Sequence, residues 1–152
     1  MFINRKLAIP VILIVMAITL TACSDAFVDA LNPAIDEFNE AAENFNDQMD
    51  LLTADNEIFS DPDWVASTET SLSVLRGAGL ALRNLPEPDS SDYNRLNSLV
   101  QQLADATVSF VDTYRTALAS GNISLTDDAD PYMDKINELL PQINAEISRL
   151  DN

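Results

Sequence analysis

The 152-residue sequence contains no histidine, one cysteine, three glycines and only eight basic residues. Without histidine, the chain has no Ser-His-Asp or Cys-His catalytic arrangement, no axial histidine for haem and none of the usual zinc sites. One cysteine excludes a disulfide framework within the chain. No segment shows the alternation of apolar and polar residues that marks a half-buried strand. The sequence therefore predicts an all-helical protein that is not an enzyme and that uses no cofactor.

Acidic residues outnumber basic residues by 25 to 8, which gives a formal net charge of −17. This excess opposes electrostatic binding to DNA, RNA or an anionic membrane surface, because all of these attract basic proteins. It is compatible with a basic partner, with a soluble particle that repels its own copies, or with life in high salt. We therefore expect no nucleic-acid partner.

The first 22 residues have the layout of an export signal, and such segments are excluded from fold reasoning. Arg5 and Lys6 form a short basic region, and the stretch from Leu7 to Ala22 is uncharged and mostly aliphatic. This uncharged run has 16 residues, whereas a membrane-spanning helix needs about 20. The segment is therefore predicted to be a signal peptide, residues 1–22, that is removed by cleavage.

The end of this segment, Leu20-Thr21-Ala22-Cys23, resembles the lipobox of bacterial lipoproteins. The resemblance covers residues 1–23 and implies that Cys23 carries fatty acyl chains such as palmitate, and that the bond from Ala22 to Cys23 is cleaved. It also implies lipid anchoring on the extracytoplasmic side of the cell membrane or of an outer membrane, which Ser24 favours. Two or three acyl chains are needed for stable attachment. The alternatives are an ordinary secretory peptide with an incidental cysteine, or an uncleaved anchor.

Four apolar stripes at helical spacing follow the signal segment. The first consists of Val28, Leu31, Ile35, Phe38, Ala42, Phe45, Met49 and Leu52. The others run from Val65 to Leu82, from Leu96 to Leu118 and from Met133 to Leu150. Connections between them are short, so neighbouring helices should be antiparallel. We predict a lipidated Cys23 and tether over residues 23–30, and an acidic up-down-up-down four-helix bundle over residues 31–152.

Proline and glycine residues indicate where the predicted helices begin and end. The first helix starts either at Asn32-Pro33 or near Asp25, in which case Pro33 kinks it. Asp61-Pro62 and Asp130-Pro131 each combine an N-cap aspartate with a proline at the first helical position. We expect the third helix to start near Ser90 and to stop at Ser120-Gly121-Asn122, and Pro141 to interrupt the last helix.

The second predicted helix has one flank that is nearly uncharged. Glu69, Arg76 and Arg83 lie seven residues apart along the other edge. Because an exposed helix face normally carries charge, this flank either packs inside the bundle or docks an envelope protein or a second copy of the chain. Gly77 and Gly79 each cost about 1 kcal/mol relative to alanine, which close backbone approach would offset. The tentative docking residues are Ala66, Ser73, Val74, Gly77, Leu80 and Ala81.

Two acid-rich segments are candidates for cation binding, Asp61-Pro62-Asp63 and Asp127-Asp128-Ala129-Asp130. Neither has the glycine and glutamate spacing of an EF-hand loop, and both Asp-Pro pairs suit helix starts. We therefore predict no metal site. The leading hypothesis is a non-enzymatic envelope interaction or accessory protein that is anchored through Cys23. The alternative is an extracytoplasmic binding protein for a cation or small ligand, held in the bundle core or in the segment from Gly121 to Asp130.

Overall fold

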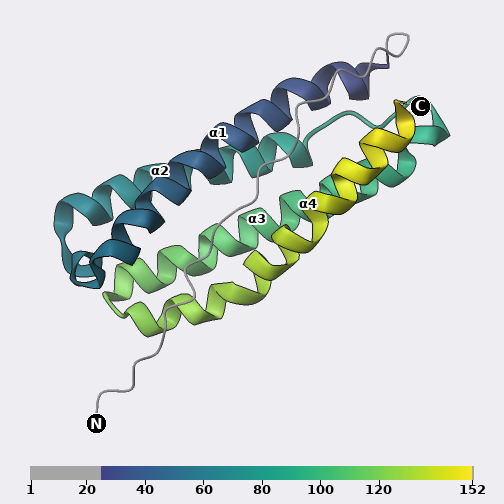
Figure 1. The fold of residues 1–152 in the computed structure, drawn as a ribbon. Helices are drawn as coiled ribbons and strands as arrows, with labels where there is room; N and C mark the ends of the chain where they lie inside the picture. Colours follow the sequence, from purple (N-terminus) through teal and green to yellow (C-terminus); the bar gives the residue numbers. More distant parts are fainter. Residues whose placement is uncertain (1–24, 152) are drawn as a thin grey trace.

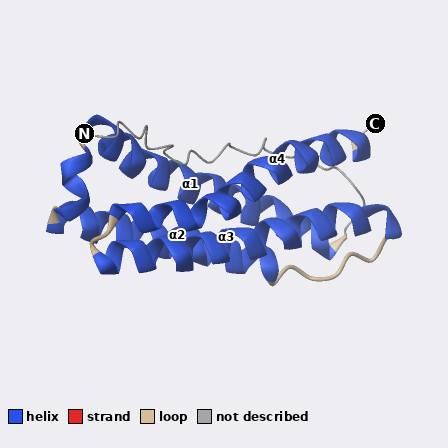
Figure 2. Cartoon of the chain, turned by 90° about the horizontal axis from the view of Figure 1, so that it is seen from below, coloured by secondary structure: helices blue, strands red, loops and turns tan. Residues whose placement is uncertain are grey.

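The computed structural model describes residues 25–151, so the predicted signal peptide, its cleavage site and Cys23 lie outside the described residues. The described part contains four long helices and no strand (Figures 1 and 2). The long helices are α1 (Ala26–Ala54), α2 (Pro62–Arg83), α3 (Asn94–Ser120) and α4 (Asp130–Leu150). Short 3-10 helices fill the connections: η1 (Asn56–Ser60), η2 (Ser91–Tyr93) and η3 (Ile123–Ala129).

Successive long helices run in opposite directions (Figure 1). Helix α1 packs on α2, α2 packs on α3, and α3 packs on both α4 and η3. The predicted all-α antiparallel four-helix bundle, with up-down-up-down topology, is confirmed. One end of the bundle holds the start of α1, the connection between α2 and α3, and the end of α4. Asp25 caps α1 there, so we call it the Asp25 end. The other end holds η1 and η3, and we call it the η1 end.

Aromatic rings from α1 and α3 meet in the centre of the bundle. The Phe45 ring lies edge-to-face against Phe110 and Tyr114, with ring centroids 5.4 and 5.6 Å apart. The Tyr114 hydroxyl donates a hydrogen bond to Met49 Sδ at 3.2 Å, and burial raises the pKa of this phenol. Every residue of the predicted α1 stripe is buried. The helical spacing of apolar residues therefore identified the core correctly.

Helix α1 begins at Ala26, which supports the alternative start near Asp25 and not a tether that extends to residue 30. The Asp25 carboxylate caps the helix by accepting a hydrogen bond from the Phe27 N–H at 2.9 Å, and Pro33 lies inside the helix. An internal proline costs about 3 kcal/mol. Phe27 and Val28 are almost completely buried, and full burial of each such side chain contributes about 1.5–3 kcal/mol. The free energy of burying these two side chains offsets the cost of Pro33, so the helix extends on the N-terminal side of the proline.

The other predicted helix boundaries are only partly right. Asp61 caps α2 as expected, and Gly121, with φ of 64°, ends α3 in the left-handed conformation that favours glycine. Asp130 does not cap α4: the residue before the helix is Ala129, and Asp130 is the first helical residue. The reason is that η3 runs directly into α4, so no extended cap residue is present. Helix α4 also continues through Pro141 without interruption.

A buried carboxylate joins α4 to α3 at the Asp25 end. The Glu146 side chain is 3% exposed and accepts hydrogen bonds from Arg149 at 2.7 and 3.0 Å. Arg95 of α3 lies 3.5 Å from its other oxygen. The hydrogen bond from Arg149 lowers the pKa of Glu146 and outweighs the opposing effect of burial, and both positive charges lower it further. Glu146 therefore stays ionised in the folded protein at neutral pH.

This lowered pKa predicts a pH-dependent effect of Glu146 on stability. The ionised group stabilises the fold above its unfolded pKa of about 4.3, and this contribution is lost as pH falls through the lower folded pKa. Glu146→Gln should lower the melting temperature at pH 7, and the difference from wild type should shrink at pH 3. Circular dichroism melts measure both, with exposed Glu40→Gln as the control. An equal difference at both pH values would contradict the assignment.

Candidate functional site

Three ion pairs along the contact between α2 and α3 determine which side of α2 faces outward. Their closest nitrogen–oxygen distances are 3.0 Å for Arg115 to Glu69, 2.9 Å for Arg76 to Asp112, and 2.6 Å for Arg83 to Asp105. The hydrogen bond to Asp112 raises the pKa of Arg76. Partly exposed pairs of this kind add little stability. Their spacing along both helices instead specifies the rotation and register of α2.

Close contact at Gly79 fixes the same rotation. A Cβ atom at Gly79 would lie 3.1 Å from Thr107 Cγ2 and 3.4 Å from Val108 Cγ2, so α3 approaches the α2 backbone closely at this residue. A Cβ atom at Gly77 would meet no atom within 4 Å. The close approach predicted for both glycines is therefore confirmed for Gly79 and wrong for Gly77, which faces open space.

The predicted uncharged flank of α2 lies on the outside of the bundle. Ala66, Ser73, Val74 and Gly77 are exposed, and Leu80 and Ala81 are half-buried. The interpretation that this flank packs inside the bundle is therefore wrong for the four exposed residues. We call the six residues together the α2 outer face. The Val74 side chain is 50% exposed, and the Ser73 hydroxyl accepts a hydrogen bond from Arg115. The face is thus apolar or hydroxylic, with charges along its α3 edge.

The acid-rich segment around η3 does not gather metal ligands. Within residues 25–151, no group of three or more cysteine, aspartate or glutamate side chains lies close enough to hold a metal ion. Burial raises the pKa of Asp130, and the negative charges of Asp127 and Asp134 raise it further. The ionised form of Asp130 is therefore disfavoured, and the described residues around η3 gather no set of ligands for a cation.

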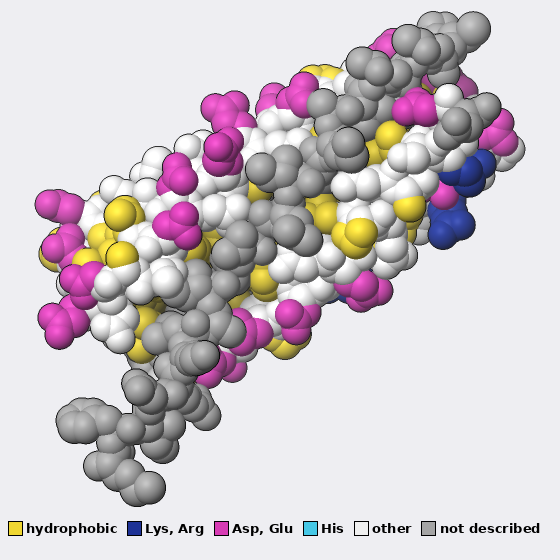
Figure 3. Space-filling model, in the orientation of Figure 1, with side chains coloured by type: hydrophobic (Ala, Val, Ile, Leu, Met, Phe, Trp, Pro, Cys, Tyr) yellow, Lys and Arg dark blue, Asp and Glu magenta, His cyan; other side chains and the backbone are white. Residues whose placement is uncertain are grey.

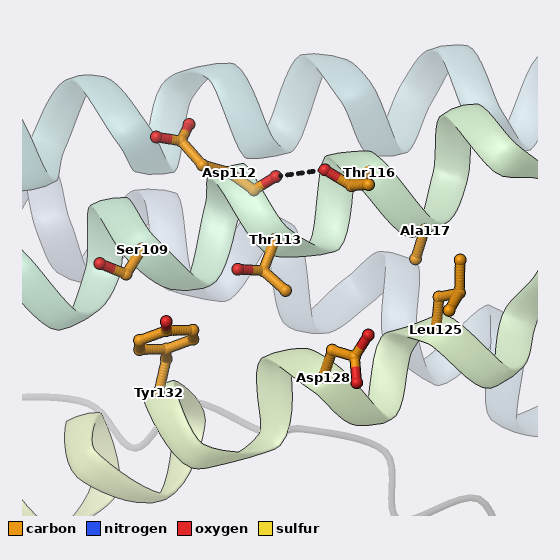
Figure 4. A pocket seen from close by; sticks show the side chains of 8 residues that line it. All are labelled: Ser109, Asp112, Thr113, Thr116, Ala117, Leu125, Asp128 and Tyr132. Atoms are coloured by element: carbon orange, nitrogen blue, oxygen red, sulfur yellow. Dashed lines mark hydrogen bonds between the residues drawn. The ribbon is translucent and has the colours of Figure 1, made fainter.

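A shallow cleft of about 390 Å³ lies between α3 and the segment formed by η3 and the start of α4 (Figure 4). Tyr132 points across it toward Ser109 and Thr113 of α3, and Asp128 also borders it. Asp112 borders the cleft too, but its carboxylate turns toward α2, where it pairs with Arg76. The cleft offers hydroxyl groups and a carboxylate to a small polar molecule. The sequence-based alternative placed a small ligand in the segment from Gly121 to Asp130, which supplies Leu125 and Asp128 to this cleft. The wall from α3 was not predicted, because Ser109 reads as an ordinary polar position.

No protein-family model, no curated protein and no solved structure matches this chain. Across residues 25–151, no helix combines the length and the apolar character that crossing a bilayer requires. The function is therefore argued from the chain's own residues. The feature that packing within the bundle leaves unexplained is the α2 outer face.

The contrast between the two α2 glycines gives a matched pair of substitutions. Gly77→Leu should stabilise the protein by about 0.5–1 kcal/mol, because it raises helix propensity without a clash. Gly79→Leu should destabilise it by about 1–3 kcal/mol, because the side chain overfills the contact with Thr107 and Val108. Urea denaturation of the two variants and wild type measures both values. Effects of the same sign and size would mean that α2 is rotated differently against α3.

Proposed function

We propose that this chain is a bacterial lipoprotein held on the extracytoplasmic side of the cell membrane or outer membrane by acylated Cys23. We further propose that it acts there as a non-enzymatic envelope interaction or accessory protein, through the α2 outer face. The anchoring proposal is supported by the sequence Leu20-Thr21-Ala22-Cys23 after a basic region and an uncharged run. Two or three acyl chains on one cysteine suffice for stable attachment.

The junction between Cys23 and the bundle is short, which gives the anchor a mechanical consequence. Helix α1 starts at Ala26 with Asp25 as its cap, so Ser24 alone separates Cys23 from the first residue that the structure describes. The Asp25 carboxylate also accepts a hydrogen bond from the Ser90 N–H at 3.4 Å. Acyl chains on Cys23 would therefore hold the Asp25 end beside the bilayer. A 29-residue helix spans about 43 Å, so the η1 end would reach well away from it.

The exposure of the α2 outer face is the observation that carries the docking proposal. Val74 is half-exposed, and the space beside Gly77 is open. Small residues let the backbone of another helix approach closely, and an uncharged face costs little to remove from water. Anchoring adds to this by raising the local concentration of the protein near partners in the same envelope. The partner is an envelope protein or a second copy of this chain.

The alternative function, binding of a small ligand, is favoured by the cleft between α3 and the segment formed by η3 and the start of α4. Its volume of about 390 Å³ is near the lower limit for ligand pockets. It is shallow, and the carboxylate of Asp112 is already engaged with Arg76. We therefore prefer the α2 outer face, where the intramolecular contacts that we find leave the exposed surface unused.

Placing a charge on the α2 outer face tests the docking proposal. Val74→Glu should leave the melting temperature nearly unchanged, because the residue is half-exposed, but should abolish recovery of the partner after crosslinking in native membranes. The partner is identified by mass spectrometry in the wild-type sample. Ala145→Glu places the same charge on an exposed position of α4 and should leave recovery unchanged.

Three outcomes would contradict this proposal. Equal losses with Val74→Glu and Ala145→Glu would mean that added charge alone disturbs the complex. Unfolding by Val74→Glu would mean that the face belongs to the core. Recovery that neither variant changes would place the contact elsewhere on the bundle.

A further inference from the structure

The η1 end of the bundle carries a second, apolar cleft, which we call the η1 cleft. It has a volume of about 480 Å³ and lies between the last turns of α1, the 3-10 helix η1 and the first turns of α2. Leu51, Ile58 and Trp64 contribute the apolar part of its lining, and Asp55, Asp61 and Asp63 the charged part. Its volume lies within the range of about 300–1,000 Å³ that is typical of binding pockets. It is separate from the six residues of the α2 outer face.

The apolar floor of the η1 cleft is built in advance of any binding. The Trp64 indole N–H donates a hydrogen bond to the Gln48 carbonyl at 3.2 Å, and the Trp64 ring packs on Phe59 with centroids 5.8 Å apart. These contacts hold the indole in place. Leu51, on the other wall, is 54% exposed, more than any other large hydrophobic side chain of the described part. Part of this surface is therefore apolar and unburied.

The rim of the η1 cleft is acidic and lacks balancing cations. Residues 24–75 contain no lysine or arginine. Asp55 and Asp61 each use Oδ1 to accept backbone hydrogen bonds of 2.9–3.0 Å at helix starts. Asp63 is exposed beside them, and Asp47 lies one turn before Leu51 on α1. No ion pair between described residues involves these four carboxylates.

The surface charges of the bundle are distributed unevenly along its length. On the face shown in Figure 3, acidic side chains occur along the whole length of the bundle, whereas the clearly visible lysine and arginine side chains lie at the Asp25 end. A positively charged molecule is therefore attracted to the η1 end more strongly than to the Asp25 end. Such an uneven field raises the rate of association with a basic partner.

We propose that the η1 cleft binds a basic peptide segment in which one bulky apolar side chain is flanked by lysine or arginine. The apolar side chain would cover Leu51 and Trp64, and the flanking cations would pair with the carboxylates of the rim. A metal ion has no apolar group for the floor, a polyamine offers only thin methylene chains in place of a bulky side chain, and an anionic lipid is repelled by the rim. The binding does not depend on acylation of Cys23, although the orientation of the cleft away from the membrane does.

Fluorescence of Trp64, the single tryptophan of the chain, reports on the floor of the cleft directly. The probe is the pentapeptide amide Lys-Lys-Phe-Lys-Lys. The full-length protein is studied in phosphatidylcholine vesicles if it is membrane-bound, or in buffer if it is not. We expect a saturable change of the Trp64 emission, and a dissociation constant that rises with salt. Replacing the phenylalanine of the peptide by alanine should abolish the saturable change.

Matched variants distinguish binding at the η1 cleft from electrostatic attraction of the peptide to the whole acidic protein. The double variant Asp47→Asn with Asp63→Asn should weaken binding about fivefold, since each exposed ion pair contributes modestly. The control double variant, Asp36→Asn with Glu40→Gln, removes two charges from exposed positions nearer the start of α1, away from the cleft. It should change binding less than twofold. Leu51→Ser should weaken binding at least threefold.

Equal weakening by the two double variants would overturn the proposal, because it would show attraction by net charge without a site. Equal binding of the phenylalanine and alanine peptides, or no saturable change at all, would overturn it as well. Loss of membrane attachment would affect only the anchoring proposal, because the peptide measurement is valid in either medium.

Discussion

The rotation of α2 against α3 decides what this bundle presents to its surroundings. Gly79 lets the two backbones come close, since a Cβ atom there would press on Thr107. Three ion pairs along the same contact, from Glu69 to Arg83 on α2, fix the register. With both constraints in place, the uncharged flank has to face outward. The buried apolar stripe of α2 acts in the same direction, because a different rotation would move Leu72, Leu75 and Leu82 out of the core.

The two ends of the bundle differ in charge and in how their charged side chains are paired. At the Asp25 end, buried Glu146 forms ion pairs with Arg149 and Arg95. The Asp25 carboxylate accepts hydrogen bonds from the N–H groups of Phe27 and Ser90. At the η1 end, acidic side chains surround the η1 cleft and no basic residue occurs between residues 24 and 75. If Cys23 is acylated, the Asp25 end lies beside the lipid and the η1 end faces away from it. Attachment and the binding of a basic peptide would then occupy opposite ends of the bundle.

Helical periodicity and the short connections were sufficient to predict the bundle, its topology and most of its core. The apolar stripes missed other buried residues, among them Phe27, Val111 and Leu139. Proline and aspartate were less reliable as signals of helix starts, because tertiary packing competes with these local preferences. Pro33 suggested a helix start, but burial of Phe27 extends α1 back to Ala26. Asp130 was predicted to cap α4, but it is the first helical residue because η3 runs directly into α4. The flank of α2 could be identified from its missing charges, whereas the η1 cleft could not, because it joins residues from three elements.

Lipid attachment at Cys23 is the central claim, and metabolic labelling tests it most directly. Cells that produce the wild-type chain or Cys23→Ser are grown with radiolabelled palmitate, and the protein is then isolated from the membrane and soluble fractions. The account predicts label in the wild-type protein in the membrane fraction. It also predicts that Cys23→Ser takes up no label and keeps its signal peptide. An unlabelled wild-type protein, or a Cys23→Ser form that is still processed and stays in the membrane, would contradict it.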